Sequence, residues 1–129
     1  MECDSVLVVE DDADLQDNIC QLFEDEGYKV HRASNGQQAL ERLEELEHDL
    51  PGLIVLDLMM PVMSGEVFLE TLAREHSGDW ARIPILVVTA LGTAGASIKG
   101  IPIHVELFRK PFSVDQLMTV AQRLLRKTA

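Results

Sequence analysis

The sequence is poor in aromatic side chains and in cysteine, and both shortages limit how it can fold. Aromatics make up 5% of its 129 residues, so a hydrophobic core has to consist of aliphatic side chains and methionine. Cys3 and Cys20 are the only cysteines, and neither a CxxC motif nor a zinc-site spacing is present. We therefore expect one aliphatic core without a disulfide framework.

Basic residues are also scarce. The chain has 11 Lys and Arg against 22 Asp and Glu, which gives a formal net charge of −11. Nucleic acids and anionic membrane surfaces attract basic proteins, so this balance argues against direct binding to either. It favours a divalent cation or a basic protein surface as the partner.

Long apolar runs are missing, and so is a basic N-terminus followed by an apolar segment. No stretch approaches the roughly 20 apolar residues of a membrane helix, and no secretory signal is visible. We therefore expect a cytoplasmic protein. The length fits one domain spanning residues 1–129, with its core between about residues 5 and 126.

What the sequence does contain is an alternation of short apolar runs with segments of helical period. The runs have the length of strands and lie at residues 5–9, 28–33, 52–56, 84–88 and 102–108. Helical spacing follows most of them, at residues 13–26, 37–47, 64–75 and 113–126. This alternation predicts an α/β protein with a parallel sheet covered by helices on both faces. Only residues 89–102, with three glycines, break the pattern, which predicts a short or degenerate fourth helix.

Acidic side chains follow two of the expected strands. Residues 10–12 (Glu10, Asp11 and Asp12) come directly after the first strand, and Asp57 follows the third. Ligands bind open parallel sheets beyond the carboxyl ends of the strands, where these carboxylates would converge if the two strands are neighbours. Two carboxylates about 4 Å apart repel by roughly 4 kcal/mol near a protein surface, so a cation would have to offset them. Oxygen ligands of this kind suit Mg²⁺. The alternative is an ordinary solvated turn, with Asp12 as a helix N-cap.

A hydroxyl and an ammonium group are predicted at the same edge of the sheet. Thr89 ends the fourth expected strand, and Lys110 follows the fifth. A lysine is a compact positive charge that suits a phosphate oxygen. Taken singly, Thr89 is as well explained as a helix cap and Lys110 as a surface lysine. Together, each at a strand end, they indicate a site.

In this combination the sequence resembles the response-regulator receiver family of two-component (phosphorelay) signalling. The similarity runs from about residue 5 to 126 and rests on four motifs in order: Val8-Val9-Glu10-Asp11-Asp12, Asp57-Leu58-Met59-Met60-Pro61 with Gly65, Thr89-Ala90, and Lys110-Pro111-Phe112. The resemblance implies a flavodoxin-like, three-layer, doubly wound fold with a five-stranded parallel sheet in the order 2-1-3-4-5.

The resemblance also implies a role for individual residues. Asp57 would be the phosphoacceptor, with Thr89 and Lys110 contacting phosphoryl oxygens. Mg²⁺ would be held by the residues that match the family's metal site: Glu10 (through water), Asp11, Asp57 and the backbone carbonyl of Met59. Phosphorylation would then switch a protein–protein interaction surface. We expect no enzyme acting on an external substrate, although the domain could catalyse its own phosphorylation and dephosphorylation.

The implied partners are a sensor histidine kinase or phosphotransfer protein as donor, and an output protein or domain that the sequence does not identify. A homodimer is left open. The output pathway and the cognate kinase are equally undetermined by the sequence.

Two features depart from the family pattern. Receivers usually carry Tyr or Phe three residues before the Lys after strand five, where this chain has Leu107; Phe108 follows on the opposite face of the strand. The switch that Thr89 and Leu107 would form is therefore expected to be altered. We expect residues 91–100 to be mobile and to order on phosphorylation or partner binding instead. Apolar Met59 and Leu91 beside the acceptor should slow hydrolysis of the acyl phosphate.

Three other functions share part of this pattern. A Mg²⁺-dependent phosphohydrolase would carry Asp-x-Asp after the first strand, and a flavodoxin a Ser/Thr/Gly phosphate loop there; this chain has Glu10-Asp11-Asp12. A binding module that works without phosphorylation is the stronger alternative. Asp57, Thr89 and Lys110 argue against it, and Leu107 keeps it open.

Overall fold

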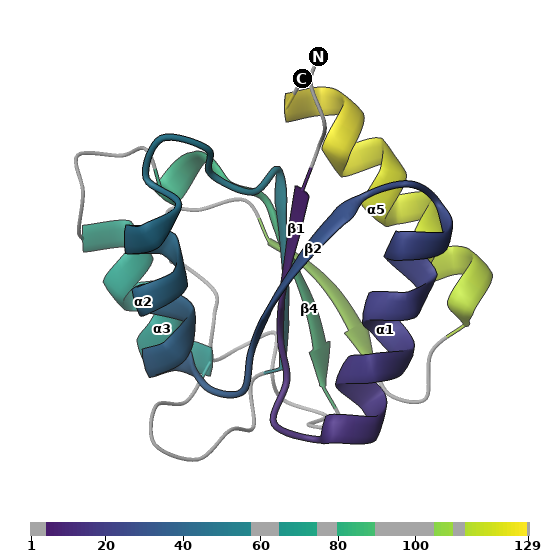
Figure 1. The fold of residues 1–129 in the computed structure, drawn as a ribbon, viewed down its shortest axis with the longest axis horizontal. Helices are drawn as coiled ribbons and strands as arrows, with labels where there is room; N and C mark the ends of the chain where they lie inside the picture. Colours follow the sequence, from purple (N-terminus) through teal and green to yellow (C-terminus); the bar gives the residue numbers. More distant parts are fainter. Residues whose placement is uncertain (1–4, 58–64, 75–79, 90–104, 110–112, 129) are drawn as a thin grey trace.

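The computed structural model describes residues 5–57, 65–74, 80–89, 105–109 and 113–128 (Figure 1). Strands and helices alternate along most of this part of the chain. Their order is β1 (Ser5–Val9), α1 (Ala13–Asp25), β2 (Lys29–Ala33), α2 (Gly36–Glu45), β3 (Leu53–Asp57), α3 (Gly65–Arg74), the 3₁₀ turn η2 (Trp80–Arg82), β4 (Ile85–Thr89), β5 (Val105–Arg109) and α5 (Val114–Thr128). The fourth helix, which the sequence predicts to be short or degenerate, falls outside the described residues.

The strands form one parallel sheet in the order β2-β1-β3-β4-β5. The parallel α/β class of fold that the sequence predicts is therefore confirmed. Val9 pairs with Leu56 of the neighbouring strand, and Asp57 pairs with Val88. This register places the carboxyl ends of β1, β3 and β4 at one edge of the sheet.

Helices cover both faces of the sheet, α1 and α5 on one side and α2 and α3 on the other (Figure 1). Side chains alternate along each strand, so that Leu7 packs toward α2 and α3 while Val6 and Val8 pack toward α1 and α5. Both layers of the core are almost wholly aliphatic, as the composition predicts.

The apolar stripes of the helices are buried or partly buried at most of their described positions. The helical spacing over residues 113–126 predicts that Val114 is in the core, and this prediction is wrong, because the side chain is 46% exposed. Val114 is the first residue of α5, and Leu117, almost one turn later, is the first residue of that helix buried against the sheet.

The ends of α1 follow directly from the residues that flank it. The Asp12 carboxylate accepts hydrogen bonds from the Asp14 and Leu15 N–H groups at 3.0 and 3.2 Å, so the N-cap interpretation of Asp12 is confirmed. At the other end Gly27 adopts a left-handed φ of 92°, which glycine reaches without steric cost. Tyr28 N–H donates to the Phe23 carbonyl at 3.1 Å, and the two rings pack edge to face.

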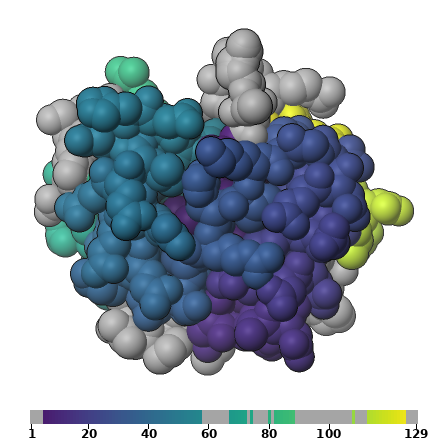
Figure 2. All heavy atoms as spheres, viewed as in Figure 1, coloured from purple at the N-terminus to yellow at the C-terminus, as the bar shows by residue number. Residues whose placement is uncertain are grey.

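Strand β2 is an edge strand of the sheet. The face of the molecule on which it lies is formed mainly by the N-terminal half of the chain (Figure 2). Arg42 Nε of α2 donates to the Arg32 carbonyl at 3.1 Å, and Arg32 pairs with Asp17 of α1. Gln38 accepts a hydrogen bond from Ser34 N–H at 2.8 Å. The Arg42 contact satisfies a backbone carbonyl that an open sheet edge would leave exposed.

Candidate metal centre

The carboxyl ends of β1 and β3 bring three acidic side chains together. Glu10 comes directly after β1 and Asp57 is the last residue of β3, so the register that pairs Val9 with Leu56 sets them side by side. One carboxylate oxygen from each of Glu10, Asp11 and Asp57 lies within 4.8 Å of the others. The structure thus gathers carboxylates that lie 47 positions apart in the chain, counted from residue 10 to residue 57.

Two of these carboxylates are buried. Glu10 is 2% exposed and Asp57 is 4% exposed, whereas Asp11 is exposed and forms the open side of the group. At separations below 5 Å, each pair of charges repels by about 3 to 4 kcal/mol at an effective dielectric of 20. A bound cation would offset this repulsion.

The donor atoms indicate which cation fits. In the described part of the chain the group contains only carboxylates, with no His or Cys in it. Zinc sites in proteins typically include His nitrogen or Cys sulfur ligands, whereas all-oxygen ligands with room for water suit Mg²⁺ or Ca²⁺. The residues present therefore fit a hard divalent cation.

Asp12 belongs to the same acidic run, and its carboxylate caps α1 instead of joining the group. Its backbone N–H contributes to the site, because it donates to Glu10 Oε2 at 3.2 Å. The three consecutive acids after β1 therefore divide into two that face the cluster and one that begins the helix.

A buried glutamine, which the sequence analysis did not single out, lies behind these acids. Gln16 is 8% exposed, and its side-chain Nε2 donates to the carbonyls of Glu10 and Ala33 at 3.0 and 2.9 Å. The sequence feature that could have pointed to Gln16 is its place as a polar residue on the otherwise apolar stripe of α1. It lies three positions before Ile19 and seven before Phe23.

Thr89 ends β4, where it pairs with Arg109 of β5. It follows Val88, the partner of Asp57, so its backbone lies at the same edge of the sheet as the acids. The remaining predicted site positions lie outside the described residues, namely the Thr89 and Leu107 side chains, Met59 and Lys110. Their roles stay predictions.

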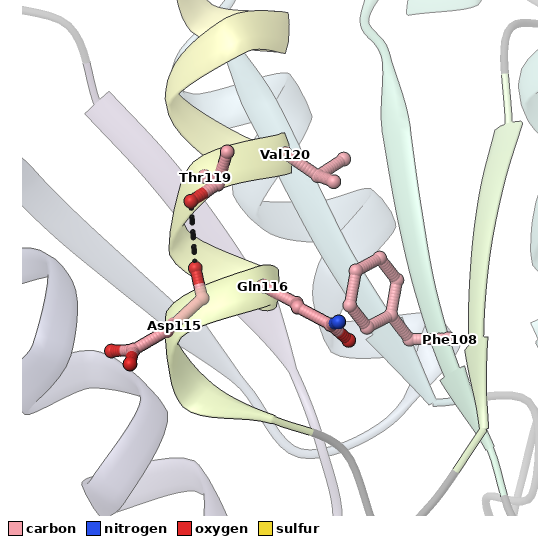
Figure 3. A pocket seen from close by; sticks show the side chains of 5 residues that line it. All are labelled: Phe108, Asp115, Gln116, Thr119 and Val120. Carbon is pink, nitrogen blue, oxygen red and sulfur yellow. Dashed lines mark hydrogen bonds between the residues drawn. The ribbon is translucent and has the colours of Figure 1, made fainter.

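Phe108 faces the α5 side of the sheet, as its position after Leu107 predicts, and packs against the core on that side. In Figure 3 its ring borders a hollow of about 320 Å³ between β5 and α5, lined also by Asp115, Gln116, Thr119 and Val120. None of the clustered acids lines this hollow, which is therefore distinct from the acidic cluster.

Comparison with known proteins agrees with this geometry. The family model of the response regulator receiver domain matches residues 6–122. The chain belongs to this family, which confirms the resemblance inferred from the motifs. It is accordingly a receiver domain of the two-component signalling systems.

Individual relatives show how much of a protein the match covers. Response regulator Rre1 of Synechocystis sp. is 33% identical over 125 residues, covering 95% of this chain and 52% of Rre1. The DNA-binding dual master transcriptional regulator RpaA of the same organism is 32% identical over 124 residues, covering 95% of this chain and 49% of RpaA. The chain thus spans about half the length of the curated relatives it matches.

Among solved structures, the receiver domain of the Francisella response regulator 1452 superposes with a TM-score of 0.80 at 28% identity. The match covers 98% of this chain and 99% of that domain. The likeness therefore extends over the whole domain.

The expectations about nucleic acid and membranes have different outcomes. RpaA is named as a DNA-binding protein, so the expectation that this chain contacts no nucleic acid stays a prediction. Across the described residues, every helix is too short or too polar to cross a membrane.

Proposed function

We propose that this receiver domain accepts a phosphoryl group on Asp57 in the presence of Mg²⁺, and thereby changes a surface that a partner protein recognises. The observation that carries the proposal is the cluster itself. A carboxylate that is 4% exposed ends the third strand, with two further carboxylates within 4.8 Å. Such crowding of like charges is costly in a purely structural role.

Glu10, Asp11 and Asp57 would hold the Mg²⁺, together with the Met59 carbonyl that the family pattern implies. The bound ion would supply positive charge that offsets both the carboxylates and the transferring phosphoryl oxygens. The exposed side of the group, at Asp11, leaves room for water and phosphate oxygens.

Asp57 would act as the nucleophile. One carboxylate oxygen forms a bond to phosphorus while the bond from phosphorus to the donor breaks, either to nitrogen of a phosphohistidine or to oxygen of an acyl phosphate. The electron pair of the broken bond leaves with the donor. Phosphoryl transfer requires mainly positioning and charge stabilisation, which Thr89 and Lys110 would complete through the phosphoryl oxygens.

The product adds roughly two negative charges at a site that already holds three carboxylates. That change would bias the surroundings of Thr89 and so the surface seen by the partner. We expect a sensor histidine kinase or phosphotransfer protein as donor, an output protein or domain as recipient, a homodimer as a further assembly to test, and a cytoplasmic location. We expect no turnover of an external substrate.

The experiment is incubation of the protein with acetyl phosphate and Mg²⁺, followed by intact-mass spectrometry. We expect one phosphoryl adduct that disappears in Asp57→Asn and when EDTA removes the Mg²⁺. Asp49→Asn is the matched control, because it makes the same chemical change at an exposed position that precedes β3.

The outcomes separate the alternatives. No adduct on the parent protein favours a module that binds without phosphorylation. An adduct that persists in Asp57→Asn places the acceptor elsewhere. Steady release of phosphate from an ester would revive the phosphohydrolase.

A further inference from the structure

We infer that Gln16 is a positioning residue for the metal centre, because its carboxamide holds the peptide that joins Glu10 to Asp11. The inference rests on the proposed function and deepens it, since it concerns how the chain shapes the Mg²⁺ site. Gln16 does not belong to the acidic group, and nothing in the family motifs quoted above points to it.

The backbone of Glu10 is held on both sides. Its N–H donates to the Ala33 carbonyl at 3.0 Å, and its own carbonyl accepts from Gln16 Nε2 at 3.0 Å. That carbonyl belongs to the same planar peptide unit as the N–H of Asp11, so fixing its direction fixes where Asp11 begins. The orientation of both acids therefore depends on this peptide.

The second proton of the carboxamide ties the same point to the neighbouring strand. Gln16 Nε2 also donates to the Ala33 carbonyl at 2.9 Å, at the end of β2. A carboxamide nitrogen carries two N–H donors, and the two carbonyls use both. Because carbonyls only accept, this also fixes which end of the carboxamide faces them.

Helix α1 supplies the rigid base for this contact. Gln16 N–H donates to the Asp12 carbonyl at 2.9 Å in the first turn of the helix, and Asp12 in turn caps that turn. Gln16 itself is 8% exposed. The carboxamide is therefore held by helix, β1 and β2 together, which leaves little freedom for the peptide between the two acids.

The consequence is a more exact geometry of the acidic group. Mg²⁺ demands near-ideal octahedral geometry, so its affinity is sensitive to small displacements of the ligands. Groups that orient metal ligands without touching the ion typically change metal affinity by about 10- to 100-fold when they are removed. We expect a loss toward the lower end of that range, because Asp11 is exposed and can partly readjust.

The test is the Mg²⁺ affinity of the unphosphorylated chain of residues 1–129, measured by isothermal titration calorimetry. Gln16→Met keeps the length of the side chain and removes both donors, so we expect its Mg²⁺ dissociation constant to rise about tenfold. Gln16→Asn keeps the carboxamide on a side chain one methylene shorter, and we expect a smaller rise. If Gln16→Met does not fold, the Mg²⁺ dissociation constant of Gln16→Asn tests the inference.

Two control variants on the same helix separate positioning from general stability. Ile19→Val removes a methyl group from the core below α1 and lowers folding stability without touching either carbonyl. Gln21→Met makes the same substitution at an exposed glutamine whose side chain donates to Asp25 of the same helix. We expect both controls to bind Mg²⁺ with the affinity of the parent protein.

Nuclear magnetic resonance gives a second measurement that does not depend on binding. Loss of the carboxamide should increase hydrogen exchange at the Glu10 amide more than at amides in the middle of β1. Equal Mg²⁺ affinity in the parent and in both Gln16 variants overturns the inference, as does an equal loss in Ile19→Val. Absence of Mg²⁺ binding to the parent itself overturns the metal site of the proposed function, and this inference with it.

Discussion

Three consecutive acids after β1 show how much the role of a side chain depends on the direction in which it leaves the backbone. Glu10 and Asp11 bring oxygens to within 4.8 Å of Asp57. Asp12 turns toward the helix and accepts from Asp14 and Leu15 N–H groups. The composition does not distinguish the three acids, whereas the structure places two of them in the acidic cluster and one at the N-cap of α1.

This division predicts that stability and phosphorylation respond separately to changes at Asp12. Asp12→Ala should lower the free energy of unfolding by about 1 kcal/mol, because the first turn of α1 loses its N-cap. The backbone N–H that bonds Glu10 remains, so phosphorylation by acetyl phosphate should persist. Urea denaturation and mass spectrometry measure the two effects.

Asp12→Ser is the matched control for this prediction, since a hydroxyl also caps a helix and should preserve most of the stability. If Asp12→Ala abolished phosphorylation while folding remained intact, Asp12 would have to be counted among the metal ligands.

At the level of a single element, β2 carries a partly buried histidine close to two cationic side chains. The pKa of His31 is lowered, first by burial and then by the positive charges of Lys29 and Arg42, with Asp49 acting in the opposite direction. Arg42 is held in place because it also bonds the Arg32 carbonyl. A group that resists protonation in the folded state makes stability depend on pH.

The sign follows from which state binds the proton first. In the unfolded chain the His31 pKa returns to 6.5, above its value in the folded protein. As the pH falls through 6.5, the unfolded state takes up the proton before the folded state does, so the free energy of unfolding decreases. Above pH 6.5, His31 adds little to the pH dependence of the free energy of unfolding.

We therefore predict that His31→Gln makes stability less dependent on pH below about 6.5, when urea denaturation is compared at about pH 5 and pH 7.5. His48→Gln is the control for removing an imidazole from the surface, because His48 is 95% exposed. If the parent and His31→Gln lost equal stability on acidification, the lowered pKa of His31 would be contradicted.

For the molecule as a whole, the dominant electrostatic feature is its net charge of −11, part of which is concentrated at one edge of the sheet. The unfolded chain separates these carboxylates, so a cation that requires all three binds the folded state. Such a ligand stabilises the fold by about 2.7 kcal/mol at a concentration 100-fold above its dissociation constant.

We predict that Mg²⁺ raises the urea denaturation midpoint of this protein, and that Asp11→Asn reduces the rise. Sodium chloride at equal ionic strength is the control, because salt screens the general repulsion of a strongly acidic protein. An equal rise with sodium would mean that screening, and not a specific site, explains the stabilisation.

Much of the fold could be predicted because its determinants are local. Apolar runs with helical segments between them predict a parallel α/β protein, and an acidic run that follows a strand predicts where ligands bind. Gly27 follows the end of α1 with a φ of 92°, a left-handed conformation that favours glycine whatever lies around it. Hydrophobic periodicity, helix capping and the residue types that follow a strand each depend on a few neighbouring residues of the sequence.

Other features depend on which segments meet, and only the tertiary structure decided them. Gln16 breaks the apolar stripe of α1, and its function becomes visible only when the carbonyls of Glu10 and Ala33, 23 positions apart in the chain, converge on it. Val114 looks like a core residue by spacing but is 46% exposed. The physical reason is that burial and hydrogen bonding are set by packing between elements, which a local pattern of residue types does not specify.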